Sequence, residues 1–302
     1  MNQASHRQSL ANRRFSPAGR RSFTWLISIA AVLVLAGAIY QLNAYHEMHK
    51  RTIGDGRNVE SYRFDLSNFA GDRSMLVTSG LPKDGLPAVD GPTMYSPEQV
   101  DELAERDPYR WTRAMAANEP IIGVVIDGEA RAYPIRFLKL HEIINDQIGG
   151  TPVVVTFSPI SRAAAVFDRR VDGQTLQFSF SGLVYKQNLV MYDRRDDPAA
   201  ESLWSQVGMR AISGPMQGKQ LTVLPSRLTF WDRWRQAHPS TSVMAPIREF
   251  RKRYRETPFP PQYASGEPQL PVGPLPPDDS PIALNVPVAA WRGEDGGWRA
   301  LP

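Results

Sequence analysis

The segment of residues 23–42 constrains this chain most, because its sequence, FTWLISIAAVLVLAGAIYQL, contains no charged residue. As an α-helix it would extend for roughly 30 Å, the thickness of the hydrocarbon core of a bilayer. Trp25 and Tyr40 stand near its two ends, where amphipathic rings favour the membrane interface. We therefore predict one transmembrane helix within residues 23–45. A buried helix of a soluble protein is the weaker alternative, since globular cores rarely contain so long an uncharged stretch.

The charges around this segment predict its orientation. Residues 1–22 hold five arginines and no acidic residue, although the net charge of all 302 residues is only +4. By the positive-inside rule the basic tail stays in the cytoplasm and the main domain lies outside, in the periplasm of a Gram-negative cell. Basic tails also bind nucleic acid. Directly before an apolar span, however, the tail indicates membrane topology, so we expect a lipid bilayer and no nucleic acid as partner.

Two fates of the apolar segment remain open. Ala36-Gly37-Ala38 has the small-x-small form that signal peptidases cleave. The apolar stretch continues through residues 39–42, which favours an uncleaved signal-anchor. The residues Arg20-Arg21-Ser22-Phe23 are similar to a twin-arginine export signal, but Thr24 weakens the match. The main domain is exported whether the segment is cleaved or remains as an anchor.

Beyond residue 45 the composition divides the chain into three regions. Residues 46–118 are polar and rich in turn signals, and Ser96 followed by Pro97 predicts a helix over 97–105. Residues 119–245 have the apolar patterns of a packed domain. Residues 246–302 are rich in proline, so we predict extended or disordered chain there. The basic run at 248–255 is interpreted as a solvated helix face, with contact to anionic headgroups as the alternative.

Within residues 119–245 the patterns predict more strands than helices. Residues 121–126 and 129–135 are alternating runs on either side of Asp127-Gly128, which predicts a β-hairpin. Apolar residues then recur at helical spacing over 137–148. Further strands are predicted at 152–157, 163–169, 174–180, 184–193 and 221–224, and a helix at 228–238. The expected fold is an α+β domain, mainly antiparallel β with a few helices.

The segment Ser158-Pro159-Ile160-Ser161 matters because of what it lacks. It follows the predicted strand 152–157, and a two-residue separation at a strand end is where proteins place paired thiols for redox exchange or metal capture. Here both positions are serine, and the chain has no cysteine. A hydroxyl forms no disulfide and is a poor ligand for soft metals. The sequence therefore excludes thiol chemistry, and we predict no metal and no cofactor.

An ordered series of motifs resembles the bacterial family named domain of unknown function 3179, over roughly residues 75–245. The motifs are ARAYPI at 130–135, HEIIND at 141–146, GGTPVVVTFSP at 149–159, SGLVYKQNLVMYDR at 181–194 and SLWSQ at 202–206. The family name gives neither fold nor activity. Many members carry Tyr-Cys-Pro-Leu-Cys, some with selenocysteine, where this chain has residues 157–161. The resemblance thus implies a redox or metal site whose thiols are absent at Ser158 and Ser161.

His141 is the remaining candidate for chemistry. The sequence after it is similar to a zincin helix, which needs histidines at the first and fifth positions, but the fifth position is Asn145. A metal set of His141, Glu142 and Asp146 would lack a second nitrogen or sulfur donor. A hydrogen-bonded structural histidine is therefore the first interpretation. The enzymatic alternative uses Ser158 or Ser161 as nucleophile and His141 as base.

Together these patterns predict a membrane-tethered, exported protein that acts by binding or as a structural component. It would carry a degenerate, cysteine-free form of the family's site. The competing hypothesis is a cell-envelope enzyme that uses His141 with Ser158 or Ser161 on an unknown substrate.

Overall fold

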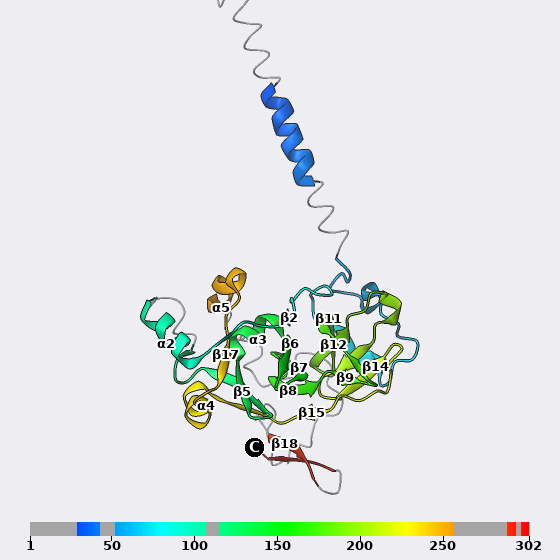
Figure 1. Cartoon of the computed structure of the whole chain (residues 1–302). Helices are drawn as coiled ribbons and strands as arrows, with labels where there is room; N and C mark the ends of the chain where they lie inside the picture. The colour runs from blue at the N-terminus through cyan, green and yellow to red at the C-terminus, as the bar shows by residue number, and fades with distance from the viewer. Residues whose placement is uncertain (1–28, 43–51, 107–114, 257–288, 294–296, 302) are drawn as a thin grey trace, which may run out of the picture. The chain divides into compact units, whose positions relative to one another are not determined.

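The computed structural model describes residues 29–42, 52–106, 115–256, 289–293 and 297–301. The chain divides into two units, Met1–Thr52 and Ile53–Pro302. In the first unit, residues 29–42 form a helix with exposed side chains (Figure 1). No helix of the described ranges is both long and apolar enough to cross a membrane. The remainder of the predicted span, residues 23–28 and 43–45, lies outside the described residues.

The second unit is built on three five-stranded sheets. The first, sheet A, has the order β1(Leu76–Thr78), β11(Phe178–Tyr185), β12(Asn188–Asp193), β13(Leu203–Ser205), β14(Arg210–Ser213). Sheet B has the order β15(Val223–Leu224), β8(Ala163–Asp168), β7(Thr151–Ser158), β6(Ile143–Ile148), β2(Val89–Asp90). Sheet C has the order β16(Ser226–Phe230), β4(Pro120–Ile126), β5(Glu129–Pro134), β17(Ser242–Met244), β3(Met94–Tyr95).

Helices and two small ribbons complete the unit (Figure 1). The helices are α2(Pro97–Arg106), α3(Ile135–His141), α4(Trp231–Ala237) and α5(Arg251–Glu256), with 3-10 turns η1(Val59–Tyr62), η2(Arg73–Met75), η4(Pro198–Ala200) and η5(Arg248–Phe250). The ribbons are β9(Arg170–Val171) with β10(Gln174–Thr175), and β18(Ala289–Arg292) with β19(Trp298–Leu301). Strand pairs are antiparallel except β2 with β6 and β5 with β17. The predicted α+β class is confirmed.

The β4–β5 hairpin and α2 form where the sequence predicts them. Asp127 and Gly128 have φ angles of 49° and 81°, so both central residues of the turn adopt the left-handed conformation of a type I′ turn. Ile121 pairs with Pro134 and Ile126 with Glu129 across the hairpin. At α2, the Ser96 hydroxyl accepts a hydrogen bond from the Gln99 amide, as a helix N-cap does.

The helix predicted over 137–148 is wrong in its second half. α3 ends at His141, and Glu142 takes a left-handed conformation with φ 56°. The chain then continues as β6, which pairs with β7. Ile143 and Ile144 point to opposite sides of sheet B and join different buried clusters. A strand that is buried on both faces is apolar at most positions, so some of its residues also fall at helical spacing. The periodicity therefore predicted a helix where the chain forms a strand.

Two other boundaries also differ from the prediction. The predicted helix 228–238 begins only at Trp231, because residues 226–230 pair with β4 as strand β16. The predicted strands 174–180 and 184–193 place the turn wrongly. The β11–β12 hairpin turns at Lys186 and Gln187, which both have positive φ. Neither residue is a glycine or asparagine, so no local turn signal marks this point of the sequence.

The basic run at 248–255 is helical, as interpreted from the sequence, but one of its faces is not solvated. Residues 248–256 form η5 and α5, and the Tyr254 side chain is buried. Its ring lies 4.6 Å from that of Phe137, between centroids. Phe250 and Tyr254 are four residues apart, so one helical face of the basic run is aromatic. Residues 257–288 lie outside the described part of the chain.

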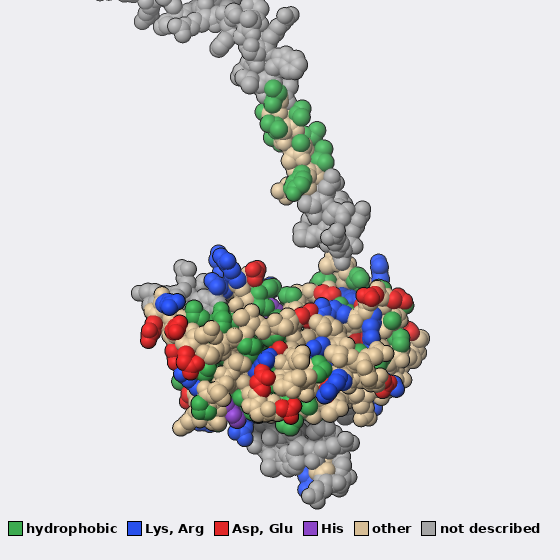
Figure 2. All heavy atoms as spheres, in the orientation of Figure 1, with side chains coloured by type: hydrophobic (Ala, Val, Ile, Leu, Met, Phe, Trp, Pro, Cys, Tyr) green, Lys and Arg blue, Asp and Glu red, His purple; other side chains and the backbone are tan. Residues whose placement is uncertain are grey.

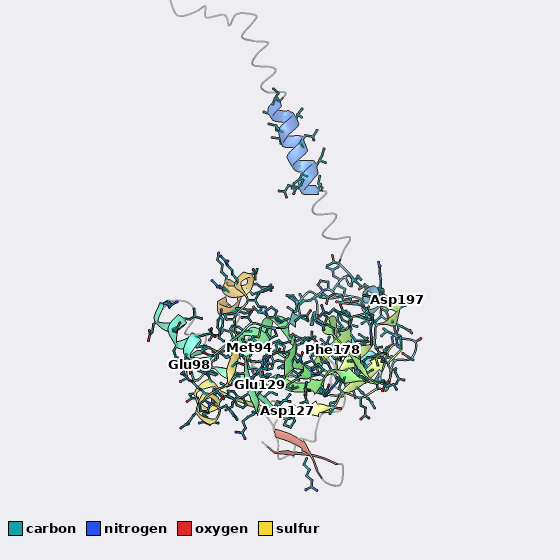
Figure 3. All side chains as sticks on the ribbon, in the orientation of Figure 1. Met94, Glu98, Asp127, Glu129, Phe178 and Asp197 are labelled. Carbon is teal, nitrogen blue, oxygen red and sulfur yellow. The ribbon has the colours of Figure 1, made fainter. Side chains whose placement is uncertain are left out.

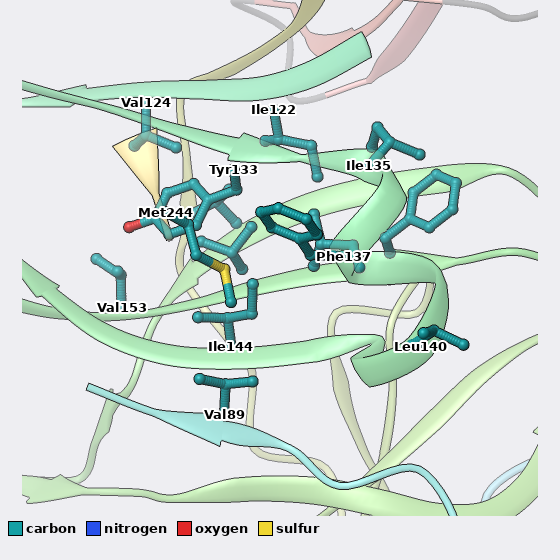
Figure 4. Close-up of a cluster of buried hydrophobic side chains, with 14 of the residues drawn as sticks. Val89, Ile122, Val124, Tyr133, Ile135, Phe137, Leu140, Ile144, Val153 and Met244 are labelled. Atoms are coloured by element: carbon teal, nitrogen blue, oxygen red, sulfur yellow. The ribbon is translucent and has the colours of Figure 1, made fainter. Parts of the chain in front are cut away.

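Sheet B is the central layer of the core. One face packs against sheet C and α3, and this cluster includes Ile122, Tyr133, Phe137, Ile144 and Val155 (Figure 4). The other face packs against sheet A through a second cluster that includes Val154, Phe167, Phe178, Met191 and Trp204. Strands β6, β7 and β8 are therefore apolar on both sides. The ends of these strands carry the candidate site.

Tyr254→Ala should test whether the helical segment belongs to the folded unit. We expect the free energy of unfolding to fall by about 2–4 kcal/mol, because a buried aromatic side chain is removed. Tyr254→Phe should cost only about 1 kcal/mol, the usual net contribution of one hydrogen bond. The exposed Lys252→Ala is the matched control. Equal denaturation midpoints for Tyr254→Ala and Lys252→Ala would show that the segment does not pack on the core.

Candidate functional site

The two serines of the predicted site lie at the turn between β7 and β8, but in different environments. Ser158 ends β7, pairs with Ala163 and is buried, with 1% of its surface exposed. Residues 159–162 form the turn, and Arg162 has a φ of 55°. Ser161 is on the outside of this turn and is exposed. The sequence predicted the strand end correctly, but not that only one serine would be buried.

A chain of neutral polar side chains joins this turn to sheet A. Asn188 donates hydrogen bonds from Nδ2 to the Ser161 hydroxyl at 2.8 Å and to Gln206 Oε1 at 2.9 Å. Gln206 in turn donates from Nε2 to the Thr156 hydroxyl at 2.9 Å. We call Thr156, Ser161, Asn188 and Gln206 the amide network. It contains no ionisable group.

Asn188 and Gln206 were not singled out as candidates from the sequence. Both lie within the motifs that carry the family resemblance, at 181–194 and 202–206. Asn188 begins β12, and Gln206 directly follows β13. Both are buried. The signal was available in those motifs, but only the folded sheets bring them to the turn after β7.

His141 is held at both ring nitrogens. Its Nδ1 lies 2.7 Å from the carbonyl oxygen of Pro87, so Nδ1 carries the proton because a carbonyl only accepts. Its Nε2 lies 2.7 Å from the Tyr254 hydroxyl, which donates to the neutral ring. Burial lowers the pKa of His141 and favours this neutral form. In the described part of the chain, no hydrogen bond links His141 to Ser158 or Ser161.

Glu142 is an unusual residue of this region. It is 8% exposed, and its carboxyl group makes no hydrogen bond with any residue that the structure describes. Burial raises the pKa of Glu142 to about 8, so the carboxyl is largely protonated at neutral pH. Its backbone carbonyl accepts a hydrogen bond from the Phe157 amide at 2.9 Å, which places Glu142 beside the end of β7. A non-glycine residue in a left-handed conformation is also strained.

No hydrogen bond is found for the Ser158 hydroxyl or the Glu142 carboxyl among the described residues, but neither is a fully buried atom without a partner; among those residues that atom is Arg194 Nε. Buried polar groups are nearly always hydrogen-bonded, so an exception indicates a water, an ion or a ligand. The backbones of the two residues are neighbours, because the Phe157 amide donates to the Glu142 carbonyl, and the Ser158 side chain points to the opposite face of β7 from that of Phe157. Both residues thus border the junction of α3, β6 and β7.

Asp146, which the sequence offered as a metal ligand with His141 and Glu142, is fully engaged elsewhere. Its Oδ2 accepts hydrogen bonds at 2.6 Å from Arg131 and from the Tyr133 hydroxyl. Arg131 also pairs with Glu129, which is labelled in Figure 3. These contacts tie β6 of sheet B to β5 of sheet C. Among the described residues, no group of three or more His, Cys, Asp or Glu side chains has the arrangement of a metal site.

A separate hollow of about 580 Å³ lies between α2 and α4. Its lining includes Glu98, Asp101, Trp231 and Arg235 but none of the candidate residues discussed above. Arg235 donates hydrogen bonds to both carboxylate oxygens of Asp101, so these two charges compensate each other. Nothing in its lining relates this hollow to the site at Ser158.

The raised pKa of Glu142 predicts how stability depends on pH. Between its ordinary pKa of 4.5 and about 8, the folded chain retains a proton that the unfolded chain has lost. Its contribution to stability is therefore full below about pH 4.5 and is lost as pH rises through 8. Glu142→Gln should remove this loss and stabilise the protein at pH 9, by on the order of 3 kcal/mol.

Urea unfolding of both proteins between pH 5 and pH 9 checks this prediction. The difference in unfolding free energy should shrink toward pH 5. The exposed Glu249→Gln is the matched control and should leave the pH profile unchanged. Parallel profiles for wild type and Glu142→Gln would mean that the Glu142 carboxyl is ionised in the folded protein.

Comparison with known proteins gives one family. The model of the family described as a protein of unknown function, DUF3179, matches residues 83–297. This match extends beyond residue 245, where the sequence motifs ended, and includes the segment that carries Tyr254. No curated protein and no solved structure matches the chain. Since the match spans more than half of its residues, the chain belongs to the DUF3179 family.

Proposed function

We propose that this protein is tethered to a membrane, faces away from the cytoplasm, and acts by binding a ligand at the junction of Glu142 and Ser158. In this proposal Ser158 and Ser161 occupy the positions of paired thiols in other family members. The ligand site is then a degenerate form of a redox or metal site, and it works through hydrogen bonds.

The tether is supported by the first unit of the chain. Residues 29–42 form a helix in which Val32, Leu33, Val34 and Leu35 are each 62–73% exposed. Four consecutive residues point to every side of a helix, so no face of it is polar. An apolar helix left in water on all sides is unfavourable, at about 25 cal/mol for each Å² of apolar surface. A bilayer would cover this surface, and the five arginines before it would keep the N-terminus in the cytoplasm.

The observation that carries the binding role is the Glu142 carboxyl, which has no hydrogen bond among the described residues although burial raises its pKa to about 8. The Glu142 carboxyl donates a hydrogen bond when protonated, and the Ser158 hydroxyl both donates and accepts. Neither group is charged at neutral pH in this environment. A ligand with neutral hydroxyl or amide groups would pair with either group, whereas an anion would gain no compensating positive charge from them. The amide network on the neighbouring side of the turn has the same neutral character.

The alternative, a cell-envelope enzyme, requires His141 to act as a base for Ser158 or Ser161. The contacts of His141 argue against this role, since its Nδ1 is hydrogen-bonded to the Pro87 carbonyl and its Nε2 to the Tyr254 hydroxyl. The Ser161 hydroxyl already accepts from Asn188. Labelling of wild-type Ser158 or Ser161 by a serine-reactive fluorophosphonate would favour this alternative over binding.

Restoring the two thiols tests the degenerate site. In a β-turn the first and fourth Cα atoms lie within about 7 Å, and disulfides need about 4.4–6.8 Å. We expect Ser158→Cys plus Ser161→Cys to form an intramolecular disulfide under mild oxidation, or to bind Zn²⁺ when reduced. Thiol titration and metal analysis measure both properties, and the wild type should show neither.

A matched control uses the same sequence spacing in extended chain. Ser226→Cys plus Thr229→Cys places two thiols three residues apart on β16, where the Cα atoms are about 10 Å apart. This pair should stay reduced. If the pair at 158 and 161 also stays reduced and binds no Zn²⁺, the proposed descent from a thiol site is wrong.

The orientation is tested by reporter fusions after Pro302. A reporter that is active only outside the cytoplasm should give signal, and one that is active only in the cytoplasm should not. Replacing Arg13, Arg14, Arg20 and Arg21 by Glu should weaken or reverse this preference, because the charge asymmetry is removed. A cytoplasmic signal from the unaltered chain would contradict the orientation.

A further inference from the structure

The helical segment 248–256, which we call the basic strap, has an aromatic inner face. The Phe250 and Tyr254 rings lie 4.8 Å and 5.8 Å from the His141 ring, between centroids. Tyr254 also hydrogen-bonds His141 and packs against Phe137. These contacts fix which side of the strap faces the core, so its other side faces away from the protein.

The outer face of the strap is strongly cationic. Arg248, Arg251 and Lys252 are exposed, and Glu249 is the one exposed acid among residues 248–254, whereas the Arg253 guanidinium lies over the Phe250 ring, 5.6 Å from its centroid. Figure 2 shows Lys and Arg side chains gathered over this segment. Because Phe250 and Tyr254 hold the inner face, Arg248 and Lys252 cannot turn inward without breaking the contact with His141. The strap is thus a positive surface with a fixed orientation.

We propose that the basic strap binds the anionic headgroups of the membrane in which the chain is tethered, an inference that rests on the proposed tether. Each Lys or Arg near an anionic bilayer strengthens the attraction about fivefold. Anionic lipid is favoured over other polyanions because the bilayer that holds the tether lies within reach of the strap. The linker of residues 43–52 extends at most about 35 Å, so the membrane is always close to the domain. Tethering of this kind makes even a weak surface contact effective.

The position of the strap within its unit agrees with this proposal. The unit begins at Ile53, and its first residues lie along the same edge as α5 (Figure 1). Asp127 lies at the opposite edge (Figure 3). An attachment at Ile53 and a contact through α5 would therefore turn the same edge toward the bilayer. The strap covers His141, so this contact would place the candidate site near the membrane surface.

The absence of cysteine makes a direct test possible. A single Glu249→Cys variant of the full chain carries a fluorophore on the strap, and Asp127→Cys carries it on the opposite edge. Each labelled chain is placed in nanodiscs of phosphatidylcholine alone or with 30% phosphatidylglycerol. A quencher attached to the lipid headgroup reports contact. We expect at least threefold stronger quenching of the strap label in anionic discs, lost in 0.5 M salt, and no such difference for the Asp127 label.

Charge reversal supplies the matched comparison. Arg248→Glu plus Lys252→Glu are added to the strap-labelled chain. They should reduce the equilibrium constant for contact between strap and bilayer, obtained from the quenching, at least tenfold. Arg227→Glu plus Arg233→Glu changes the net charge equally at exposed positions on β16 and α4, and should have little effect. All variants must keep the wild-type melting temperature. Equal quenching in neutral and anionic discs, or equal loss with both reversed pairs, would overturn the proposal.

The outcome also separates this inference from the proposed tether. A chain that does not enter nanodiscs, as judged by size-exclusion chromatography, contradicts the tether. The same labelled chain is then added to preformed anionic and neutral vesicles. Quenching only by anionic vesicles would still support the lipid-binding strap, whereas no quenching would contradict both. Stronger binding to a polynucleotide than to anionic vesicles would assign the surface to a different partner.

Discussion

The burial of sheet B on both faces is the constraint on which the rest of the structure depends. Strands β6, β7 and β8 separate two apolar clusters, so any polar side chain within them must find a partner in the protein. Asn145 shows how this is met: its amide bridges Asp90 and the backbone of Phe178, and so joins sheet B to sheet A. Arg169 meets the same requirement by donating to the carbonyl oxygens of Val153 and Leu176.

Among the described residues, Arg194 Nε is the fully buried side-chain atom without a hydrogen-bond partner, whereas Glu142 and Ser158 are largely buried residues whose polar atoms still reach solvent. They follow α3 and end β7, at the point where the central layer meets the basic strap. Thr156 lies two residues before Ser158 on β7. Its hydroxyl donates to the Ala165 carbonyl and accepts from the Gln206 side-chain amide. The fold therefore satisfies a buried polar side chain on β7 through sheet A and the neighbouring strand β8.

The basic strap changes how His141 is understood. From the sequence, His141 was a candidate base beside two serines. In the structure it is a buried connector between the Pro87 backbone and Tyr254, and burial keeps it neutral by lowering its pKa. Its role is to hold the strap against the core.

The sequence by itself determined the α+β class, the β4–β5 hairpin, α2 and the ends of β7, because turn residues, caps and period-2 alternation act locally. It also excluded thiol chemistry, since no cysteine is present. Only the tertiary structure decided that α3 stops at His141, since β6 buries both faces and its apolar spacing imitates a helix. Tertiary packing likewise brought Asn188 and Gln206 to Ser161, and Tyr254 to His141 across more than a hundred residues. Such contacts depend on which sheets stack, and no local pattern encodes that pairing.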